Sequence, residues 1–213
     1  VVVQIAPSVR VAVGEAFGYA AGENVLDRVV SALKIMGVDE VYDTNFAADI
    51  TTITEAEEFL QRLQKGGPFP MFTSCCPAWV KYLELNNPKY LKNISTCKSP
   101  MQMFASVLRE KYAEKDAADG RTPSHIAIMP CTAKKMEAKR PDYHTYGEQD
   151  TDIVLTTKEL LPMIDAHRIN HEELPLETRA MPSSLPPCGW VILATPAGFP
   201  APVLRRLPDG DAP

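Results

Sequence analysis

The chain has 213 residues, 45% of them hydrophobic and 23% charged, with a net charge of −5. This composition is typical of a globular protein with one or two domains. The negative balance, without a basic patch, excludes nucleic acid and anionic membranes as predicted partners. No apolar run approaches the roughly 20 residues of a membrane-spanning helix and no signal peptide opens the chain, so we predict a cytoplasmic protein. Because the sequence opens on the strand-like VVVQIA, we expect it to be cut from a longer chain.

The apolar residues predict strands and helices that alternate along the chain. We expect strands over residues 1–5, 41–44, 69–73, 126–129 and 153–155, and helices over 9–17, 24–36, 54–65, from 77, 100–114 and 156–166. Thr-x-x-Glu capping boxes at Thr54 and Thr156, and prolines at Pro77 and Pro100, mark helix starts. The alternation predicts an α/β fold in which parallel sheets are flanked by helices, with functional groups where strands end.

Five cysteines, Cys75, Cys76, Cys97, Cys131 and Cys188, show neither disulfide-rich nor zinc-binding spacing. Cys76 and Cys131 each follow a predicted strand and precede a helix, so we expect them to meet at the C-terminal edge of the sheet. Helix N-termini lower thiol pKa there, which favours iron–sulfur or other soft-metal ligation. Buried structural thiols are an equally good interpretation of the spacing. If Cys76 is a ligand, its neighbour Cys75 is available to carry protons.

Charged residues near these motifs allow two interpretations. Lys134 lies one turn after Cys131 and can pair with an anionic group, or it is a solvated surface lysine. Glu55 and Glu58, one turn apart, can pass protons, or they form an exposed stripe in which Glu58 pairs with Arg62, which the pattern alone favours. The histidines, His125, His144, His167 and His171, show no ligand spacing, and we interpret them as structural.

Four segments together resemble one family. FTSCCPAWV (72–80) and MPCTAKKMEAKRP (129–141) are similar to the first two signature motifs of [FeFe] (iron-only) hydrogenases, and QIAPSVR (4–10) and GPFPMF (67–72) resemble the same family. The likeness runs from Val1 to about Glu177. It implies that residues 1–180 are part of the two-lobed H-cluster catalytic domain of the large subunit.

The resemblance assigns roles to individual residues. The family's H-cluster is a four-iron cubane joined to a two-iron unit with carbonyl, cyanide and a bridging dithiolate amine. Cys76 and Cys131 correspond to cubane ligands, Cys75 to the thiol that exchanges protons with the amine, and Lys134 to a cyanide contact. The residues implied to line the pocket are Ala6, Pro7, Ser8, Met129, Pro130 and Ser99. The residues implied to form a proton route from Cys75 are Glu55, Glu58 and Ser95, with Arg62 at its outer end.

The implied activity is that of a ferredoxin hydrogenase type oxidoreductase, which reversibly reduces protons to H2. The implied partners are ferredoxin or an NAD-linked redox subunit, and maturation proteins. A non-catalytic Narf-like iron–sulfur cluster assembly protein is the alternative, and a sensory hydrogenase-like module is a third. Those relatives typically lack the relay thiol, so Cys75 favours the enzyme.

Two departures from the family pattern affect these expectations. The third motif, which supplies the other cubane ligands with C-x-x-x-C spacing, is absent, and Met101 stands where relatives have a polar residue. We therefore predict that the isolated chain is inactive and exposes an apolar face that favours aggregation. Residues 181–213 form a proline-rich tail. We hypothesise that this tail is an out-of-frame read, because ATPAG at 194–198 is a one-base shift of a glycine-rich family segment; a natural tail is the alternative.

Overall fold

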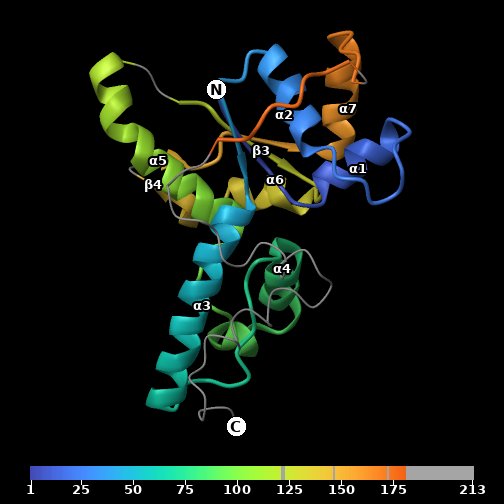
Figure 1. Cartoon of the computed structure of the whole chain (residues 1–213). Coiled ribbons are helices and arrows are strands. Elements are labelled where there is room, and N and C mark those ends of the chain that lie inside the picture. Colours follow the sequence, from blue (N-terminus) through green and yellow to red (C-terminus); the bar gives the residue numbers. More distant parts are fainter. Residues whose placement is uncertain (121–122, 146, 172, 181–213) are drawn as a thin grey trace. The chain divides into compact units, whose positions relative to one another are not determined.

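The computed structural model describes residues 1–120, 123–145, 147–171 and 173–180 (Figure 1). The predictions for Cys188 and for the tail at 181–213 therefore lie outside the described residues. The chain divides into two compact units. We call the described residues of 1–44 and 104–180 the sheet unit, and residues 45–103 the helical unit.

The sheet unit is built on a four-stranded parallel sheet with strand order β2-β1-β3-β6. The strands are β1 (Val2–Ile5), β2 (Glu40–Asp43), β3 (His125–Met129) and β6 (Ile153–Thr156). In the register, Val3 pairs with Val41 on one side and with Ile126 on the other. Four of the five predicted strands and the parallel α/β fold class are thereby confirmed.

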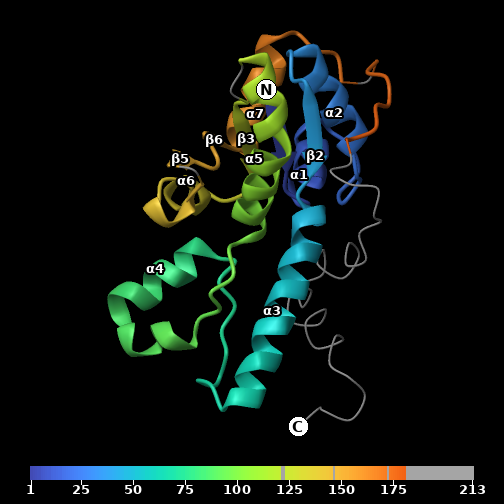
Figure 2. The same cartoon turned by 90° about the vertical axis from the view of Figure 1, so that its left-hand side faces the viewer.

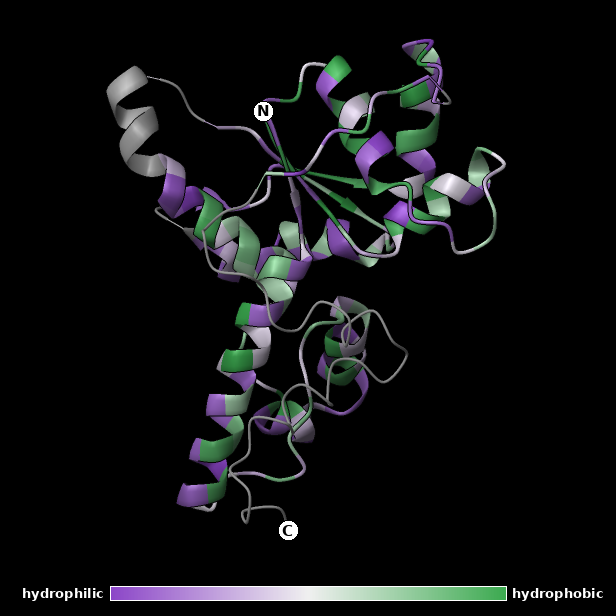
Figure 3. Cartoon of the chain, viewed as in Figure 1, coloured by the Kyte–Doolittle hydropathy of each residue, from purple (hydrophilic) through white to green (hydrophobic). Residues whose placement is uncertain are grey.

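Helices cover this sheet because its strands consist mainly of buried apolar residues; hydrophobic green is prominent on the strand arrows in Figure 3. Helices α1 (Val9–Ala16), α2 (Leu26–Ile35) and α7 (Thr157–Ala166) lie together on one side (Figure 1). On the other side, α5 (Pro100–Asp119) packs Phe104 edge-to-face on Tyr42, at 5.5 Å between ring centroids. Short α6 (Ala133–Ala138), η2 (Pro141–Tyr143) and the β4–β5 pair (His144–Thr145, Glu148–Gln149) complete the unit.

The helical unit contains α3 (Asn45–Lys65), α4 (Pro77–Asn86), η1 (Pro88–Asn93) and the first turn of α5. Figure 2 shows α4 followed closely by the short helix η1. Gly66 ends α3 with φ of +67°, a conformation that favours glycine. A Cβ at Gly67 would lie 3.0 Å from the Cβ of Arg62, so the chain can turn closely past the end of α3.

Two predicted boundaries are wrong. Helix α3 begins at Asn45 and not at Thr54. Thr54 lies inside the helix, where its hydroxyl donates to the Ile50 carbonyl one turn back, at 3.0 Å. The strand expected over 69–73 is reduced to one bridge between Phe72 and Ile94, since Pro68 and Pro70 remove backbone donors. Helix α5 also continues to Asp119. The capping box at Thr156 is confirmed, as its N–H donates to Glu159 at 2.7 Å.

The described residues contain no helix that is long and apolar enough to cross a lipid bilayer.

A buried polar group at the start of β3 makes the sheet unit sensitive to acid. The His125 ring is 2% exposed, and its Nδ1 donates to the Asp150 carbonyl at 3.0 Å while Nε2 accepts from the Gln4 amide at 3.2 Å. Burial lowers the pKa of His125 to about 4, although the backbone bond to Asp150 opposes the shift. The neutral ring is therefore the folded form, and the charged ring disfavours folding.

We predict that the free energy of unfolding falls by about 3 kcal/mol as the pH decreases from about 6.5, the ordinary histidine pKa, to about 4. The contribution of neutral His125 is fully present above pH 6.5 and is lost toward the folded pKa. Urea unfolding at several pH values measures this slope. His125→Gln should flatten it, whereas His167→Gln, which changes an exposed histidine, should keep it. An unchanged slope in His125→Gln would contradict the prediction.

Candidate functional site

The sheet unit gathers one group of predicted residues at the carboxyl ends of β1 and β3. Ile5 is in register with Ile128, and the N–H of Ala6 donates to the Ile128 carbonyl at 3.0 Å. The loops that follow the two strands therefore start side by side. The residues that this edge brings together are Ala6, Pro7, Ser8, Met129, Pro130 and Cys131. This is the strand-end position that the sequence predicts for Cys131.

Lys134 lies on α6, one turn after Cys131, with only 13% of its side chain exposed. Its Nζ donates to Glu137 at 2.8 Å, and Glu137 is 1% exposed. The interpretation of Lys134 as a solvated surface lysine is therefore wrong. An ion pair held in this way fixes a positive charge beside the strand end, where an anionic group can be bound.

The other cysteine motif belongs to the helical unit. Cys76 is the N-cap residue of α4, its side chain is exposed and makes no capping hydrogen bond, and Pro77 occupies the first helical turn. Cys75 is half-buried. The expectation that Cys76 follows a strand of the same sheet as Cys131 is wrong, because the residues before it form no ladder. Its position at a helix N-terminus is as predicted.

Glu55 is buried inside the helical unit, with 1% of its surface exposed. Within the described part of the chain, neither carboxyl oxygen has a hydrogen bond of normal geometry. Burial raises the pKa of Glu55 to about 7, and the negative charge of Glu58 adds to this rise. The nearby Ser95 side chain and Ser74 backbone lower the pKa and so oppose it. The expectation of an exposed glutamate stripe is therefore wrong for Glu55. Near neutral pH its carboxyl can both give and take a proton.

Glu58 is held by the segment that follows η1. Its Oε2 accepts a hydrogen bond from the Ser95 hydroxyl at 2.7 Å, and from the backbone N–H of Thr96 at 3.0 Å. Its Oε1 accepts from Arg62 at 2.5 Å, so the predicted i,i+4 pair is confirmed. The pair is not on an exposed stripe, since only 16% of the Glu58 side chain and 11% of the Arg62 side chain are exposed.

Sequence reasoning gave no site role to Cys97 or Thr96 of this segment, it left the role of Met101 in doubt, and only Ser99 was predicted to line the site. Burial and the neighbouring carboxylates raise the pKa of Cys97 to about 12, which keeps this thiol protonated, and its N–H donates to the Ser95 hydroxyl at 3.1 Å. Thr96 has no periodicity that singles it out; only its place beside Ser95 is a signal. Ser99 and Met101 are both buried at 1% exposure, at the start of α5.

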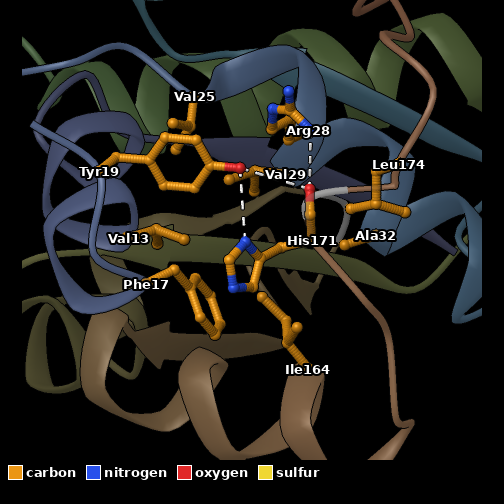
Figure 4. A pocket seen from close by; sticks show the side chains of 10 residues that line it. All are labelled: Val13, Phe17, Tyr19, Val25, Arg28, Val29, Ala32, Ile164, His171 and Leu174. Carbon is orange, nitrogen blue, oxygen red and sulfur yellow. Dashed lines mark hydrogen bonds between the residues drawn. The ribbon is translucent and has the colours of Figure 1, made fainter.

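An apolar pocket in the sheet unit contains none of the predicted site residues. His171 lies between Phe17 and Tyr19, with its ring centroid 4.4 Å from that of Phe17 (Figure 4). Arg28 donates to the His171 carbonyl at 2.8 Å. The other residues that line the pocket are Val13, Val25, Val29, Ala32, Ile164 and Leu174. The polar groups of Tyr19, Arg28 and His171 hydrogen-bond to one another. We therefore interpret this pocket as a packing contact between α1, α2, α7 and the segment that follows α7.

The described residues fit part of an iron–sulfur ligand set. Each unit presents one predicted thiol ligand, Cys131 at a strand end and Cys76 at a helix N-terminus, and iron–sulfur clusters are held by cysteine thiolates. Among residues 1–120, 123–145, 147–171 and 173–180, no three His, Cys, Asp or Glu side chains gather as a metal site. The sheet unit thus presents a thiol and a lysine at a strand end, and the helical unit presents a thiol at a helix N-terminus beside buried Glu55 and the Ser95–Glu58 pair.

The chain belongs to the iron-only hydrogenase family. The family "Iron only hydrogenase large subunit, C-terminal domain" matches residues 1–209. The chain is 42% identical over 174 residues to Iron hydrogenase 1 of Clostridium pasteurianum, covering 82% of this chain and 30% of that protein. It is 32% identical over 188 residues to the cytosolic Fe-S cluster assembly factor narfl of Danio rerio, covering 84% and 46%.

A solved variant of the [FeFe]-hydrogenase HydA1 from Chlamydomonas reinhardtii superimposes with a TM-score of 0.84 at 37% identity, over 96% of this chain and 51% of that one. The predicted resemblance and fold class are thereby confirmed. The chain therefore spans 30% of the length of the C. pasteurianum hydrogenase, about half of the HydA1 chain and less than half of the assembly factor.

Proposed function

We propose that this chain is the part of an [FeFe] hydrogenase catalytic domain that supplies two cluster ligands and a proton route. The observation that carries this proposal is the array in the helical unit: buried Glu55, the Ser95 hydroxyl, Glu58 and Arg62. Ser74, whose backbone lies close to the Glu55 carboxyl, directly precedes Cys75. Groups of this kind can pass protons from one to the next, which is the task that a hydrogenase sets its protein.

Two residues would hold the H-cluster as thiolates, Cys76 and Cys131. Lys134, whose charge is fixed by Glu137, would compensate an anionic cyanide in a site that excludes water, where ion pairs gain strength. The remaining residues that would line the cluster are Ala6, Pro7, Ser8, Met129, Pro130 and Ser99. When bound, the H-cluster supplies the redox chemistry that interconverts protons, electrons and hydrogen. The chain's own residues bind it, shield it and connect it to solvent.

The proton route follows from the chemistry of each side chain. The Cys75 thiol would exchange protons at the inner end, since a thiol is polar yet small enough to be buried. Glu55 comes next, with a pKa near 7 that lets it pass protons in both directions. The Ser95 hydroxyl both donates and accepts, and it contacts Glu58 at 2.7 Å. Arg62 holds the Glu58 carboxylate in place.

The whole protein would be an oxidoreductase with protons and H2 as substrates. Ferredoxin or an NAD-linked subunit would exchange electrons with it, and maturation proteins would insert the two-iron unit. A Narf-like assembly function is the second candidate, favoured by the 32% identity to narfl proteins. Cys75 beside Cys76, together with buried Glu55, favours the hydrogenase.

Hydrogen evolution from reduced methyl viologen tests this proposal. We define the extended chain as residues 1–180 joined to the C-terminal remainder of the catalytic domain of the C. pasteurianum relative. After anaerobic cubane reconstitution and addition of a synthetic two-iron cofactor, we expect the extended chain to evolve hydrogen. Cys75→Ala should lower the rate by about 10²- to 10⁴-fold, while Tyr82→Phe, which changes an exposed residue of α4, should leave it largely unchanged. Iron binding without hydrogen evolution would favour the assembly function.

A further inference from the structure

We propose that Thr96 is the outer end of the proton route and passes protons between Glu58 and bulk water. This inference rests on the proposed route and extends it to the surface. It also assigns Arg62 a different role from the one that the family resemblance implies. Arg62 positions the Glu58 carboxylate and does not carry protons.

The contacts of Arg62 are those of a clamp. The Nη2 of Arg62 donates to Glu58 at 2.5 Å and to the Ile94 carbonyl at 2.7 Å. Its Nη1 donates to the Asn93 carbonyl at 3.1 Å. A guanidinium has only donors and keeps its charge in proteins, so it cannot accept a proton from water. With 11% of its side chain exposed, Arg62 joins α3 to the end of η1.

Thr96 has the properties that Arg62 lacks. It is exposed to solvent, and its hydroxyl lies 3.3 Å from Glu58 Oε2. Its backbone N–H donates to the same oxygen at 3.0 Å, which keeps the residue beside the carboxylate. A hydroxyl has one donor and two acceptor sites, so it can bond to Glu58 and to water at once. The carboxylate therefore stands between a buried hydroxyl, Ser95, and an exposed one, Thr96.

The transfer needs no other group. When Glu58 takes up a proton, the Thr96 O–H bond breaks as a new O–H bond forms on Oε2, and a hydronium ion of the bulk solvent gives its proton to the threonine oxygen and becomes neutral water. No net charge remains on the hydroxyl. The 3.3 Å contact exceeds the 2.5–3.0 Å of ordinary O–H···O bonds. The threonine must therefore approach by a small side-chain rotation at the moment of transfer.

Turnover in the extended chain tests this role. Thr96→Val keeps the shape and removes the hydroxyl; we expect hydrogen evolution to fall about tenfold, less than for an inner relay group because Glu58 is partly open to water. Thr96→Ser should restore most of the rate, and imidazole buffer should partly rescue Thr96→Val. Thr54→Val, which changes an exposed threonine on α3, is the control.

Glu58→Gln separates this inference from the proposed function. If Glu58→Gln is slow and Thr96→Val runs at the parental rate, the route stands and Thr96 is not its exit. If Glu58→Gln is as fast as the parent, both the route and its exit are wrong.

A second readout needs neither cluster nor turnover. In the 213-residue chain, we expect Thr96→Val to shift the infrared carboxylate stretch of Glu58, because one hydrogen bond to that carboxylate is lost. The shift should be absent when Glu58→Gln is already present, and Thr96→Ser should match the parent. A Thr96→Val spectrum identical to the parent would overturn the inference.

Discussion

Glu55→Gln is expected to lower hydrogen evolution by the extended chain by about 10²- to 10⁴-fold. Glutamine has nearly the same shape as protonated glutamate, but it cannot release a proton to a neighbouring group. Because Glu55 is 1% exposed and its pKa is raised to about 7, it is the group of the array best matched to proton exchange near neutral pH. Glu57→Gln, which changes an exposed glutamate on the same helix, should keep the parental rate.

The same variant should be more stable than the parent at alkaline pH. The folded pKa of Glu55, about 7, lies above the ordinary value of 4.5, so folding favours the protonated carboxyl. Its contribution is fully present below pH 4.5 and is lost as the pH rises through 7. Allowing for solvent near the site, the parent should lose about 2 kcal/mol between pH 5 and 8.5, and Glu55→Gln should lose much less. Equal urea midpoints for the two chains at both pH values would show that Glu55 ionises freely in the folded state.

Arg62→Met is expected to lower the free energy of unfolding by about 2–3 kcal/mol, more than any other substitution proposed for this chain. The change leaves the Glu58 carboxylate without its cation and removes donors from the Asn93 and Ile94 carbonyls. Loss of one partner from a buried ion pair costs about 3–5 kcal/mol, and partial exposure of Glu58 reduces this figure. Urea unfolding of the 213-residue chain measures the effect.

Lys65→Met is the matched control, since Lys65 is an exposed basic residue in the last turn of the same helix. It should change stability by less than about 0.5 kcal/mol. Adding Glu58→Gln to Arg62→Met should recover part of the loss, because no unpaired carboxylate remains. If Arg62→Met is as stable as Lys65→Met, Arg62 is not a clamp.

The sheet could be predicted because its signal is local. Residues 2–5, 41–43 and 126–129 are short, mainly apolar segments between helical patterns, and a parallel sheet that is buried on both faces is built from such segments. The start of α3 could not be predicted in this way. Residues 45–54 are rich in Asn, Asp and Thr, which favour caps and turns locally, and burial of Asn45 and Thr51 in the folded chain overrides that preference.

The cysteine of the sheet unit could be predicted from local sequence, whereas the buried glutamate of the helical unit could not. Cys131 could be placed because a strand end and a helix start adjoin it in the sequence. The burial of Glu55 could not be deduced from α3 alone, since the groups nearest to its carboxyl, Ser74 and Ser95, come from distant segments. Hydrogen bonds from Ser95 and Thr96 to Glu58 span 37 and 38 residues. Only family resemblance connected Ser95 to the glutamates before the fold was known.

Isotope exchange between D2 and water tests most directly whether this chain forms part of a hydrogenase with a built-in proton route. The reaction requires a loaded cluster and a path for protons, but no electron partner. We predict that the reconstituted extended chain produces HD from D2 in ordinary water, and that Cys75→Ala and Glu55→Gln each lower the rate by at least about 100-fold. An extended chain that binds the cubane and the two-iron unit but forms no HD would contradict the hydrogenase function.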